Sequence, residues 1–274
     1  MKKDKRISSN NYVGSVVKAL RILDCFTRSQ PRLSLTKISQ QLELPKSTTL
    51  NLIRTLEHGG LLIRTPGEQN YQLGYKLMEL SYNLSSSLQI VHYARPVLEE
   101  LQTKTSEIIY LTTHINGRVL YLEAMYPSIR NINYSVIGKT LPMYCTGCGK
   151  AMLAYLPSEE IEQIYDTWPL QKFTPNTITT HDELSEELKR IRNHGYSIDV
   201  EEESIGVKCV AVPIRDSTGY PVGAISISGS LMSMKDNLLD GYAENLSNVC
   251  NSLAPYSSLF PAAQMRAIYS QETV

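Results

Sequence analysis

Apolar residues in the first sixty positions recur at the three- to four-residue spacing of amphipathic helices. This spacing predicts three short helices, over residues 15–26, 35–42 and 46–58. Ser34 is a suitable N-cap for the second helix, and Pro45 separates it from the third, because the residue before a proline leaves the α region. The third helix is expected to stop at Gly59-Gly60.

The next segment has the pattern of two short strands. Residues 61–64 and 70–73 flank a Pro66-Gly67 turn, which predicts a two-stranded hairpin. Three short helices followed by a hairpin are typical of a winged helix-turn-helix, and we assign residues 1–75 to such a domain. A helical pattern over residues 76–93 predicts a helix that links this domain to the remainder.

Beyond Pro96, helical and strand patterns mix, which indicates an α+β domain over residues 94–260. Asn116-Gly117, between the runs 108–115 and 118–126, is a strong hairpin signal. Further strands are predicted at 207–215 and 222–228, and helices at 148–155, 158–165, 182–194 and 236–253. Residues 261–274 are interpreted as a C-terminal tail without an assigned role.

Charge divides the chain in the same place as the patterns do. The 274 residues carry no net charge, but residues 1–92 hold 13 Lys and Arg against 6 Asp and Glu, and residues 93–274 hold 14 against 21. This asymmetry indicates a basic module for a polyanion joined to an acidic one, although compensating surface charges would give the same split.

Neither an apolar run of membrane-spanning length nor an apolar stretch in residues 1–10 that would act as a secretory signal is present. The five cysteines are odd in number and scattered along the chain. We therefore expect a cytoplasmic protein with reduced thiols and no membrane contact.

The third predicted helix has the side chains expected of a helix that reads DNA. Its polar face holds small hydroxyls, an amide and an arginine, with no carboxylate before Glu57. Asn51 is suited to adenine and Arg54 to guanine or a phosphate, while Leu50 either meets a thymine methyl group or packs within the domain. The predicted DNA contacts are Lys46, Ser47, Thr48, Leu50, Asn51, Arg54 and, in the hairpin, Arg64. The alternative interpretation of Arg64 is a solvated surface charge of the hairpin.

A glycine-rich segment, residues 141–150, leads into a predicted helix and would point several backbone N–H groups at one place. A small carboxylate is the expected guest, and the alternative is a tight turn with only a packing role. The Cys145-x-x-Cys148 spacing within it would suit a redox switch or half of a zinc site, but we interpret both cysteines as small residues beside the backbone. The acidic run 199–203 is interpreted as a solvated loop with one member turned inward.

An ordered set of motifs resembles the IclR family of bacterial transcriptional regulators. The motifs are Ser15-Val16-Val17-Lys18-Ala19-Leu20-Arg21-Ile22-Leu23, Leu44-Pro45-Lys46-Ser47-Thr48, Tyr71-Gln72-Leu73-Gly74, Ala94-Arg95-Pro96, Gly149-Lys150-Ala151 and Ser226-Ile227-Ser228-Gly229. The resemblance covers residues 13–255. One departure is Leu50-Asn51, where the family usually has an aromatic residue or histidine followed by arginine, so the operator sequence cannot be borrowed from a relative.

The resemblance implies both a fold and a ligand site. The implied fold is an N-terminal winged helix-turn-helix joined by a helix to a GAF-like α/β effector domain, in a chain that forms a homodimer or tetramer. Matching the family's motifs residue by residue, the implied effector-binding residues are Gly147, Cys148, Asp199, Cys209, Ser226 and Ser228.

We therefore expect a ligand-responsive regulator that binds double-stranded operator DNA, a repressor of a catabolic operon with a small carboxylate or sugar-acid effector. No cofactor, metal or catalytic residue is expected. Three alternatives stay open at this point: a redox-sensing regulator that uses Cys145 and Cys148, an enzyme in the C-terminal half, and an architectural DNA-binding protein without an effector.

Overall fold

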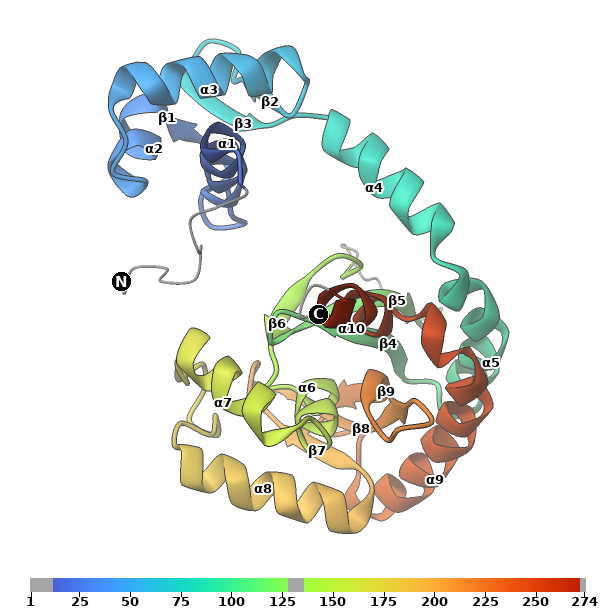
Figure 1. The fold of residues 1–274 in the computed structure, drawn as a ribbon. Coiled ribbons are helices and arrows are strands. Elements are labelled where there is room, and N and C mark those ends of the chain that lie inside the picture. The colour runs from blue at the N-terminus through green and yellow to red at the C-terminus, as the bar shows by residue number, and fades with distance from the viewer. Residues whose placement is uncertain (1–11, 128–135, 272–274) are drawn as a thin grey trace. The chain divides into compact units, whose positions relative to one another are not determined.

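The computed structural model of the chain describes residues 12–127 and 136–271. The chain divides into two compact units, residues 1–87 and 88–274, each with its own hydrophobic core (Figure 1). The boundary falls inside the segment that was expected to link the domains. Residues 1–10, on which the expectation of no secretory signal depends, lie outside the described residues.

The first unit is a helix-turn-helix domain with a small sheet, which confirms the predicted fold of this part of the chain. Its helices are α1 (Gly14–Asp24), α2 (Leu35–Gln41) and α3 (Lys46–His58). They accompany an antiparallel sheet of order β1-β3-β2, formed by β1 (Leu33–Ser34), β2 (Leu62–Arg64) and β3 (Asn70–Leu73). Strand β1 was not predicted, because two residues are too few to show a pattern.

Buried residues from all three helices and from the sheet form the core of this unit. Ile22, Ile38, Ile53 and Leu62, from α1, α2, α3 and β2, are fully buried. Ser34 is the N-cap of α2, as predicted, and its Oγ accepts a hydrogen bond from the Lys37 backbone N at 3.3 Å. The packing fixes which face of α3 points inward.

The link between the units differs from the expectation of one helix over residues 76–93 and a second one after Pro96. Helix α4 (Lys76–Ser87) ends in three serines, which are weak helix formers, and Leu88 takes a non-helical ψ of 85°. Helix α5 (Gln89–Thr105) then continues through Pro96. Four buried residues hold it there despite the lost backbone hydrogen bond, namely Ile90, Ala94, Leu98 and Leu101.

The second unit is built on a six-stranded antiparallel sheet of order β6-β5-β4-β9-β8-β7, which confirms an α+β effector-type fold. The predicted hairpin around Asn116-Gly117 is present as β4 and β5, and the shortest strands, β6 and β7, were missed. The strands are β4 (Ile108–Ile115), β5 (Arg118–Met125), β6 (Thr140–Pro142), β7 (Ser197–Val200), β8 (Val207–Arg215) and β9 (Pro221–Ser230).

The two faces of this sheet carry different chemistry. Helices α5 and α9 (Asp236–Leu253) pack on one face, where Val210, Ile225 and Ile227 are fully buried. Helix α6 (Gly147–Leu153) packs on the other face, with α8 (His181–His194) against it and α7 (Ser158–Thr167) nearby in the chain (Figure 1). Because side chains alternate along a strand, Ser226 and Ser228 project toward the α6 side.

The C-terminal segment is structured, which corrects its interpretation as a tail from residue 261 onward. A 3-10 helix (Ala254–Leu259) is followed by α10 (Pro261–Gln271). Phe260, between them, is fully buried and fills the space above Gly223, where any side chain would collide with its ring. The Ala262 backbone N donates to Thr113 Oγ1 at 3.4 Å, so α10 is fastened to β4.

We expect Phe260→Ala to lower the free energy of unfolding of the second unit by about 3–5 kcal/mol, because it leaves a cavity that the glycine backbone beneath cannot fill. Urea denaturation followed by circular dichroism measures the change. Ser258→Ala, at a neighbouring exposed position, is the matched control and should shift stability by less than about 0.5 kcal/mol. Equal effects of the two substitutions would show that α10 is not docked.

Candidate functional site

Helix α3 presents the polar face that the sequence predicted. Ser47, Asn51 and Arg54 are exposed, whereas Ile53 and Leu56 are buried in the domain. Of the remaining predicted contacts on this helix, Lys46 is exposed, and Thr48 and Leu50 are half-buried. The outward face therefore offers an amide, hydroxyls and two cations, the groups that bind base edges and phosphates.

Arg64, in the predicted hairpin, is exposed but already has partners within the domain. Its Nε lies 3.3 Å from Glu57 Oε1, and its guanidinium lies over the Tyr71 ring at 5.5 Å from the centroid. The pairing neutralises the one carboxylate of α3. Arg64 thus compensates the negative charge of Glu57 on α3, in addition to any contact that Arg64 itself makes with DNA.

The six residues implied as effector-binding lie around one cavity of about 150 Å³ in the second unit. This volume is below the roughly 300–1,000 Å³ of sites for drug-sized ligands, so the cavity suits a small molecule. The cavity is lined by Tyr110, Tyr121, Val136, Lys139, Leu141, Thr146, Gly147, Cys148, Asp199, Glu203, Ser204, Val207, Cys209, Ser226 and Ser228.

The floor of the cavity is a row of side chains across three strands. Asp199 on β7 pairs in register with Cys209 on β8, and Cys209 pairs with Ser228 on β9. Ser226 lies two residues from Ser228 and opposite Tyr110 on β4. Residues in register on one sheet face are neighbours in space, which explains how positions far apart in the sequence meet here.

Helix α6 forms the opposite wall and approaches the floor closely. A Cβ on Gly147 would lie 2.5 Å from Cys209 Sγ, so only glycine fits there. Thr146 is the N-cap, with its Oγ1 accepting from the Gly149 backbone N at 3.2 Å, and the helix begins at Gly147, one residue before the prediction. Ser197 Oγ donates to the Gly147 carbonyl oxygen at 2.6 Å and ties α6 to β7.

A carboxylate of the chain itself lies at the start of α6, where the sequence suggested a site for an anionic guest. Asp199 Oδ1 accepts from the Glu202 backbone N at 2.9 Å, and the Gly147 backbone also bonds this carboxylate. Burial raises the pKa of Asp199 to about 6, against the lowering effects of these backbone bonds and of Lys150. The group is therefore half-protonated at about pH 6 and mostly ionised at pH 7.

The acidic run 199–203 turns two members inward rather than the one that was predicted. Asp199 and Glu202 are buried, while Glu201 and Glu203 are only partly so. Burial raises the pKa of Glu202 to about 7, and Lys150 opposes the shift. Glu202 Oε2 is buried and has no hydrogen-bond partner in the described part of the chain.

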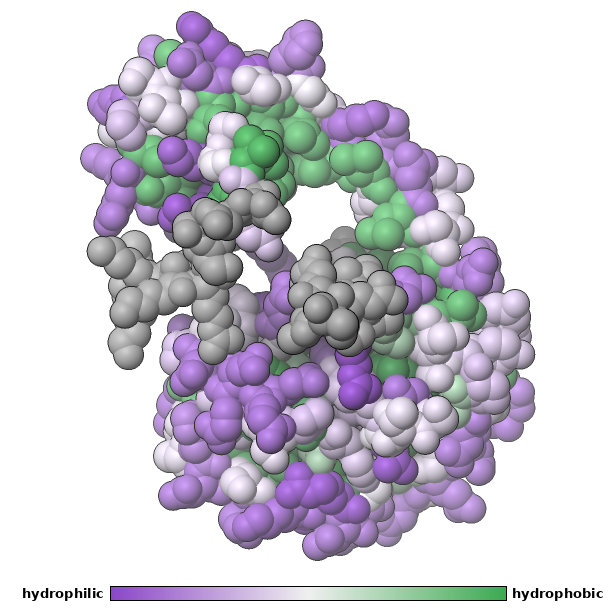
Figure 2. Space-filling view, in the orientation of Figure 1, coloured by the Kyte–Doolittle hydropathy of each residue, from purple (hydrophilic) through white to green (hydrophobic). Residues whose placement is uncertain are grey.

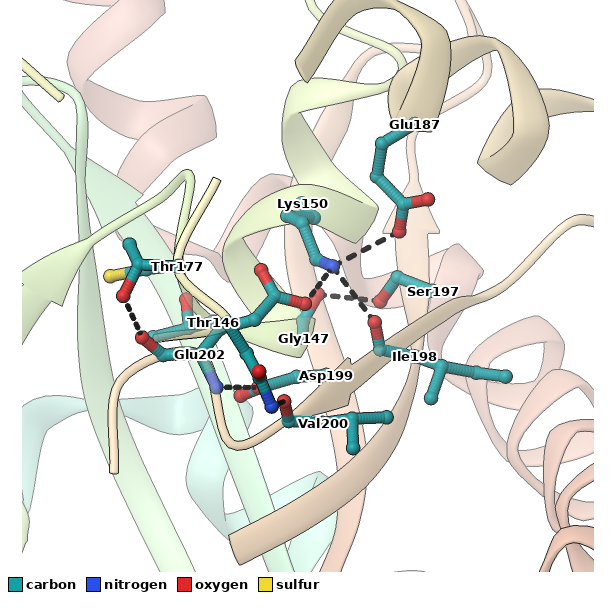
Figure 3. A network of polar contacts seen from close by, with 12 residues as sticks. Thr146, Gly147, Lys150, Thr177, Glu187, Ser197, Ile198, Asp199, Val200 and Glu202 are labelled. Atoms are coloured by element: carbon teal, nitrogen blue, oxygen red, sulfur yellow. Dashed lines mark hydrogen bonds and ion pairs between the residues drawn. The ribbon is translucent and has the colours of Figure 1, made fainter. Parts of the chain in front are cut away.

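Lys150 is the buried cation behind the cavity, and the sequence reasoning gave it no role. Its Nζ donates to Glu187 Oε1 at 3.0 Å, to the Ile198 carbonyl oxygen at 2.8 Å and to Glu202 (Figure 3). Burial disfavours the ammonium, but the two carboxylates outweigh it and raise the pKa of Lys150. The signal available in the sequence was one lysine within the otherwise apolar or small-residue run 147–154.

The cysteines of the segment are buried thiols. Burial raises the pKa of Cys145 and Cys148 above the ordinary value, and all five cysteines of the chain are free. Within residues 12–127 and 136–271, no three His, Cys, Asp or Glu side chains are grouped to bind a metal ion. Among the same residues, no helix is both long and apolar enough to cross a membrane.

Family comparisons match both units of the chain. Residues 15–66 match the IclR helix-turn-helix domain, and residues 83–254 match the C-terminal domain of the bacterial transcriptional regulator IclR. The second match alone covers more than half of the chain and contains all six of the cavity residues that the motifs implied.

Curated relatives and solved structures extend the likeness over most of the chain. The HTH-type transcriptional regulator XynR of Escherichia coli K12 is 32% identical over 234 residues, which are 85% of this chain and 93% of XynR. The transcriptional repressor IclR of the same organism is 28% identical over 228 residues, 82% of this chain and 83% of that protein. An IclR homolog from Microbacterium hydrocarbonoxydans, complexed with 4-hydroxybenzoate, has a TM-score of 0.68 at 23% identity, covering 92% of this chain and 99% of that chain.

We expect Lys150→Met to destabilise the second unit by about 3–5 kcal/mol at pH 7, because it leaves the buried Glu202 without its cation, whereas Glu187 keeps Arg190. The loss should be smaller at pH 5, where Glu202 is protonated and no longer needs compensation. Lys189→Met removes an exposed lysine paired with Glu186 and serves as the control, with an expected change of less than about 0.5 kcal/mol. A Lys150→Met effect that does not vary between pH 5 and 7 would contradict this account.

Proposed function

Because the chain belongs to the IclR family of bacterial transcriptional regulators, we propose that it represses a catabolic operon under the control of a small organic acid or sugar-derived effector. The chain is a DNA-binding transcriptional regulator with a ligand-binding C-terminal domain, and not an enzyme. The observation that carries the proposed effector control is the convergence of Gly147, Cys148, Asp199, Cys209, Ser226 and Ser228 on one cavity. A repressor role is supported by the likeness to the transcriptional repressor IclR.

The chemistry of the cavity supports a small polar ligand. The serine hydroxyls of β9 and the Asp199 carboxyl group can hydrogen-bond hydroxyl or carboxyl groups, and the Tyr110 and Tyr121 rings provide apolar contact. The tyrosine rings meet edge to face with centroids 5.1 Å apart, which gives the cavity one firm wall. The redox alternative is disfavoured by burial, because thiols with raised pKa values hold little reactive thiolate.

The proposed DNA contacts follow from the exposed face of α3. Asn51 and Arg54 would read base edges in the major groove, and Lys46, Ser47 and Thr48 would contact phosphates near the start of the helix. Leu50 would meet a thymine methyl group. A single winged helix covers a short stretch of DNA, so two copies of the chain would bind two half-sites.

Helix α4 supports the proposed homodimer or tetramer. It has no buried residue in this chain, and Met78, Tyr82 and Leu84 leave more than 60% of their surface exposed. Figure 2 shows hydrophobic residues gathered along this helix. Because contiguous exposed apolar surface marks interaction sites, we propose that α4 packs against a second copy of the chain. An effector that changes the arrangement of the copies by about 1–3 kcal/mol would change DNA occupancy roughly 5- to 150-fold.

The DNA-binding proposal is tested with fragments of genomic DNA from the source organism, captured by the full-length protein at about 0.15 M salt, where non-specific phosphate binding is weak. We expect a few fragments with paired half-sites. Asn51→Ala and Arg54→Ala should each weaken binding to such a fragment about 5- to 150-fold, the value of one bidentate base contact. Lys18→Ala removes a cation from α1 instead and should have a much smaller effect. Uniform enrichment of the genome would refute sequence-specific binding.

The assembly proposal is tested by sedimentation of the purified chain at micromolar concentration. We expect a dimer or tetramer, and Leu84→Glu should shift it toward monomer because the new charge would be buried between copies. Asn83→Glu places the same charge on the adjacent, polar position of α4 and should leave the assembly intact. A Leu84→Glu variant that sediments like the wild type would exclude α4 as the contact.

A further inference from the structure

The charged groups of the effector cavity do not favour an anion. Three of the lining residues carry charge, namely Lys139, Asp199 and Glu203. Lys139 Nζ lies 3.6 Å from Glu203 Oε1, so these two neutralise each other at the partly exposed side of the cavity. Asp199 is buried and has no cation of its own within the lining.

The nearby Lys150 does not supply the missing charge. An ammonium group has three hydrogen-bond donors, and Lys150 directs them to Glu187, Glu202 and the Ile198 carbonyl oxygen (Figure 3). Arg190 also pairs with Glu187, so Lys150 and Arg190 are both committed to Glu187 and Glu202, and Glu202 Oε2 has no partner in the described part of the chain. An anionic ligand beside an ionised Asp199 would therefore add a second uncompensated negative charge in a buried place, which is strongly unfavourable.

A protonated Asp199 removes this conflict. We propose that Asp199 binds the effector as the neutral carboxylic acid, so that a carboxylate effector and one proton enter the cavity together. The proton is taken from solvent onto Oδ2, because Oδ1 accepts the Glu202 backbone N–H at 2.9 Å, whereas Oδ2 accepts only the longer contact from Cys209 Sγ at 3.9 Å among the side chains. The new O–H then donates to an oxygen of the effector, and no covalent bond is made or broken in the ligand.

The groups around Asp199 bring its pKa close to the physiological pH range. The groups that face it are Lys150, Cys148 and the Gly147 N–H from α6, Cys145 from the segment before α6, Cys209 from β8, and Glu202 and Glu203 from the following loop. Burial raises the pKa of Asp199 to about 6, Glu203 adds to the shift, and the backbone bonds and Lys150 oppose it. The thiols of Cys148 and Cys209 are neutral, because burial raises their pKa values.

This inference rests on the proposed effector function and sets the class of effector that the cavity accepts. Low pH, at which Asp199 is protonated, favours binding of a monocarboxylate. High pH favours binding of a neutral polyol, because the ionised Asp199 accepts hydrogen bonds from hydroxyl groups. Asp199 is thus a specificity-determining residue whose protonation state decides between the two. The preference is a property of the site and can be measured with simple probes.

The binding test uses the full-length protein and two matched pairs of probes, D-gluconate with D-glucitol and lactate with propane-1,2-diol. Calorimetry at pH 5.5–8.5, in buffers of different ionisation enthalpy, gives both Kd and the number of protons taken up. We expect at least one carboxylate to bind at pH 5.5, with Kd rising about tenfold per pH unit above about pH 6.5 and with uptake approaching one proton. The matched polyol should not weaken with rising pH.

Two variants separate Asp199 from its neighbours. Asp199→Asn imitates the neutral acid, so carboxylate binding should become independent of pH. Glu203 lines the same cavity, and Glu203→Gln should change Kd by a constant factor without changing the slope of log Kd against pH. A carboxylate that binds the wild type with a pH-independent Kd, or the absence of any carboxylate binding at pH 5.5, overturns the proposal.

A ligand-free measurement keeps failure of this inference apart from failure of the proposed function. The pKa of Asp199 is raised from 3.8 to about 6 in the folded chain, so the folded state binds the proton more tightly. Asp199 therefore contributes stability that is lost as the pH rises through this window, and Asp199→Asn lacks this contribution while both proteins share that of Glu202. The difference between the Tm of Asp199→Asn and that of the wild type should therefore increase in favour of the variant from pH 4.5 to pH 7. A constant Tm difference overturns the inference whatever binds, while genomic DNA capture tests the regulator itself.

Discussion

The close approach of α6 to the antiparallel sheet is the constraint on which the second unit depends. Gly147 lies so near Cys209 that no side chain fits between helix and strand. The same helix carries Lys150 into a buried cluster with Glu187 from α8 and with Glu202. One short helix therefore sets the size of the cavity, fixes the start of the acidic loop and joins α8 to the sheet. Without Lys150 the buried Glu202 would have no cation, although Glu187 would keep Arg190, so the inward turn of the acidic loop depends on this helix.

Local sequence patterns predict most of the helices and strands of the fold. The helix over residues 46–58 and the strands over 108–115 and 207–215 have the predicted bounds, because their periodicity is long enough to be unambiguous. Strands β1, β6 and β7 span two to four residues and show no usable period. The continuation of α5 through Pro96 depends on burial of its neighbours, which is a tertiary effect that a local rule about proline cannot contain.

The cavity illustrates a different limit of sequence reasoning. Matching of family motifs identified six residues that line the cavity, and the strand register explains why they lie together. Neither the motifs nor the register indicates which charged side chains have a partner of opposite charge. The glycine-rich segment suggested an anion at the start of α6, and the structure places the chain's own Asp199 there. Charge balance depends on how Lys139 and Lys150 pair with the adjacent Glu203 and Glu202, about fifty to sixty residues further along the chain, and only their placement reveals it.

The sheet of the second unit also bears on how such a regulator can evolve. Along β9, Ile225 and Ile227 belong to the core under α9, while Ser226 and Ser228 line the cavity. One strand thus alternates core positions with cavity positions, because successive side chains point to opposite faces of the sheet. Substitutions at the two serines would change the lining of the cavity and leave the isoleucines in place, whereas Cys209 is constrained by the contact of α6 at Gly147. A duplicated gene would then acquire a cavity of different chemistry through few substitutions on one face of a single strand.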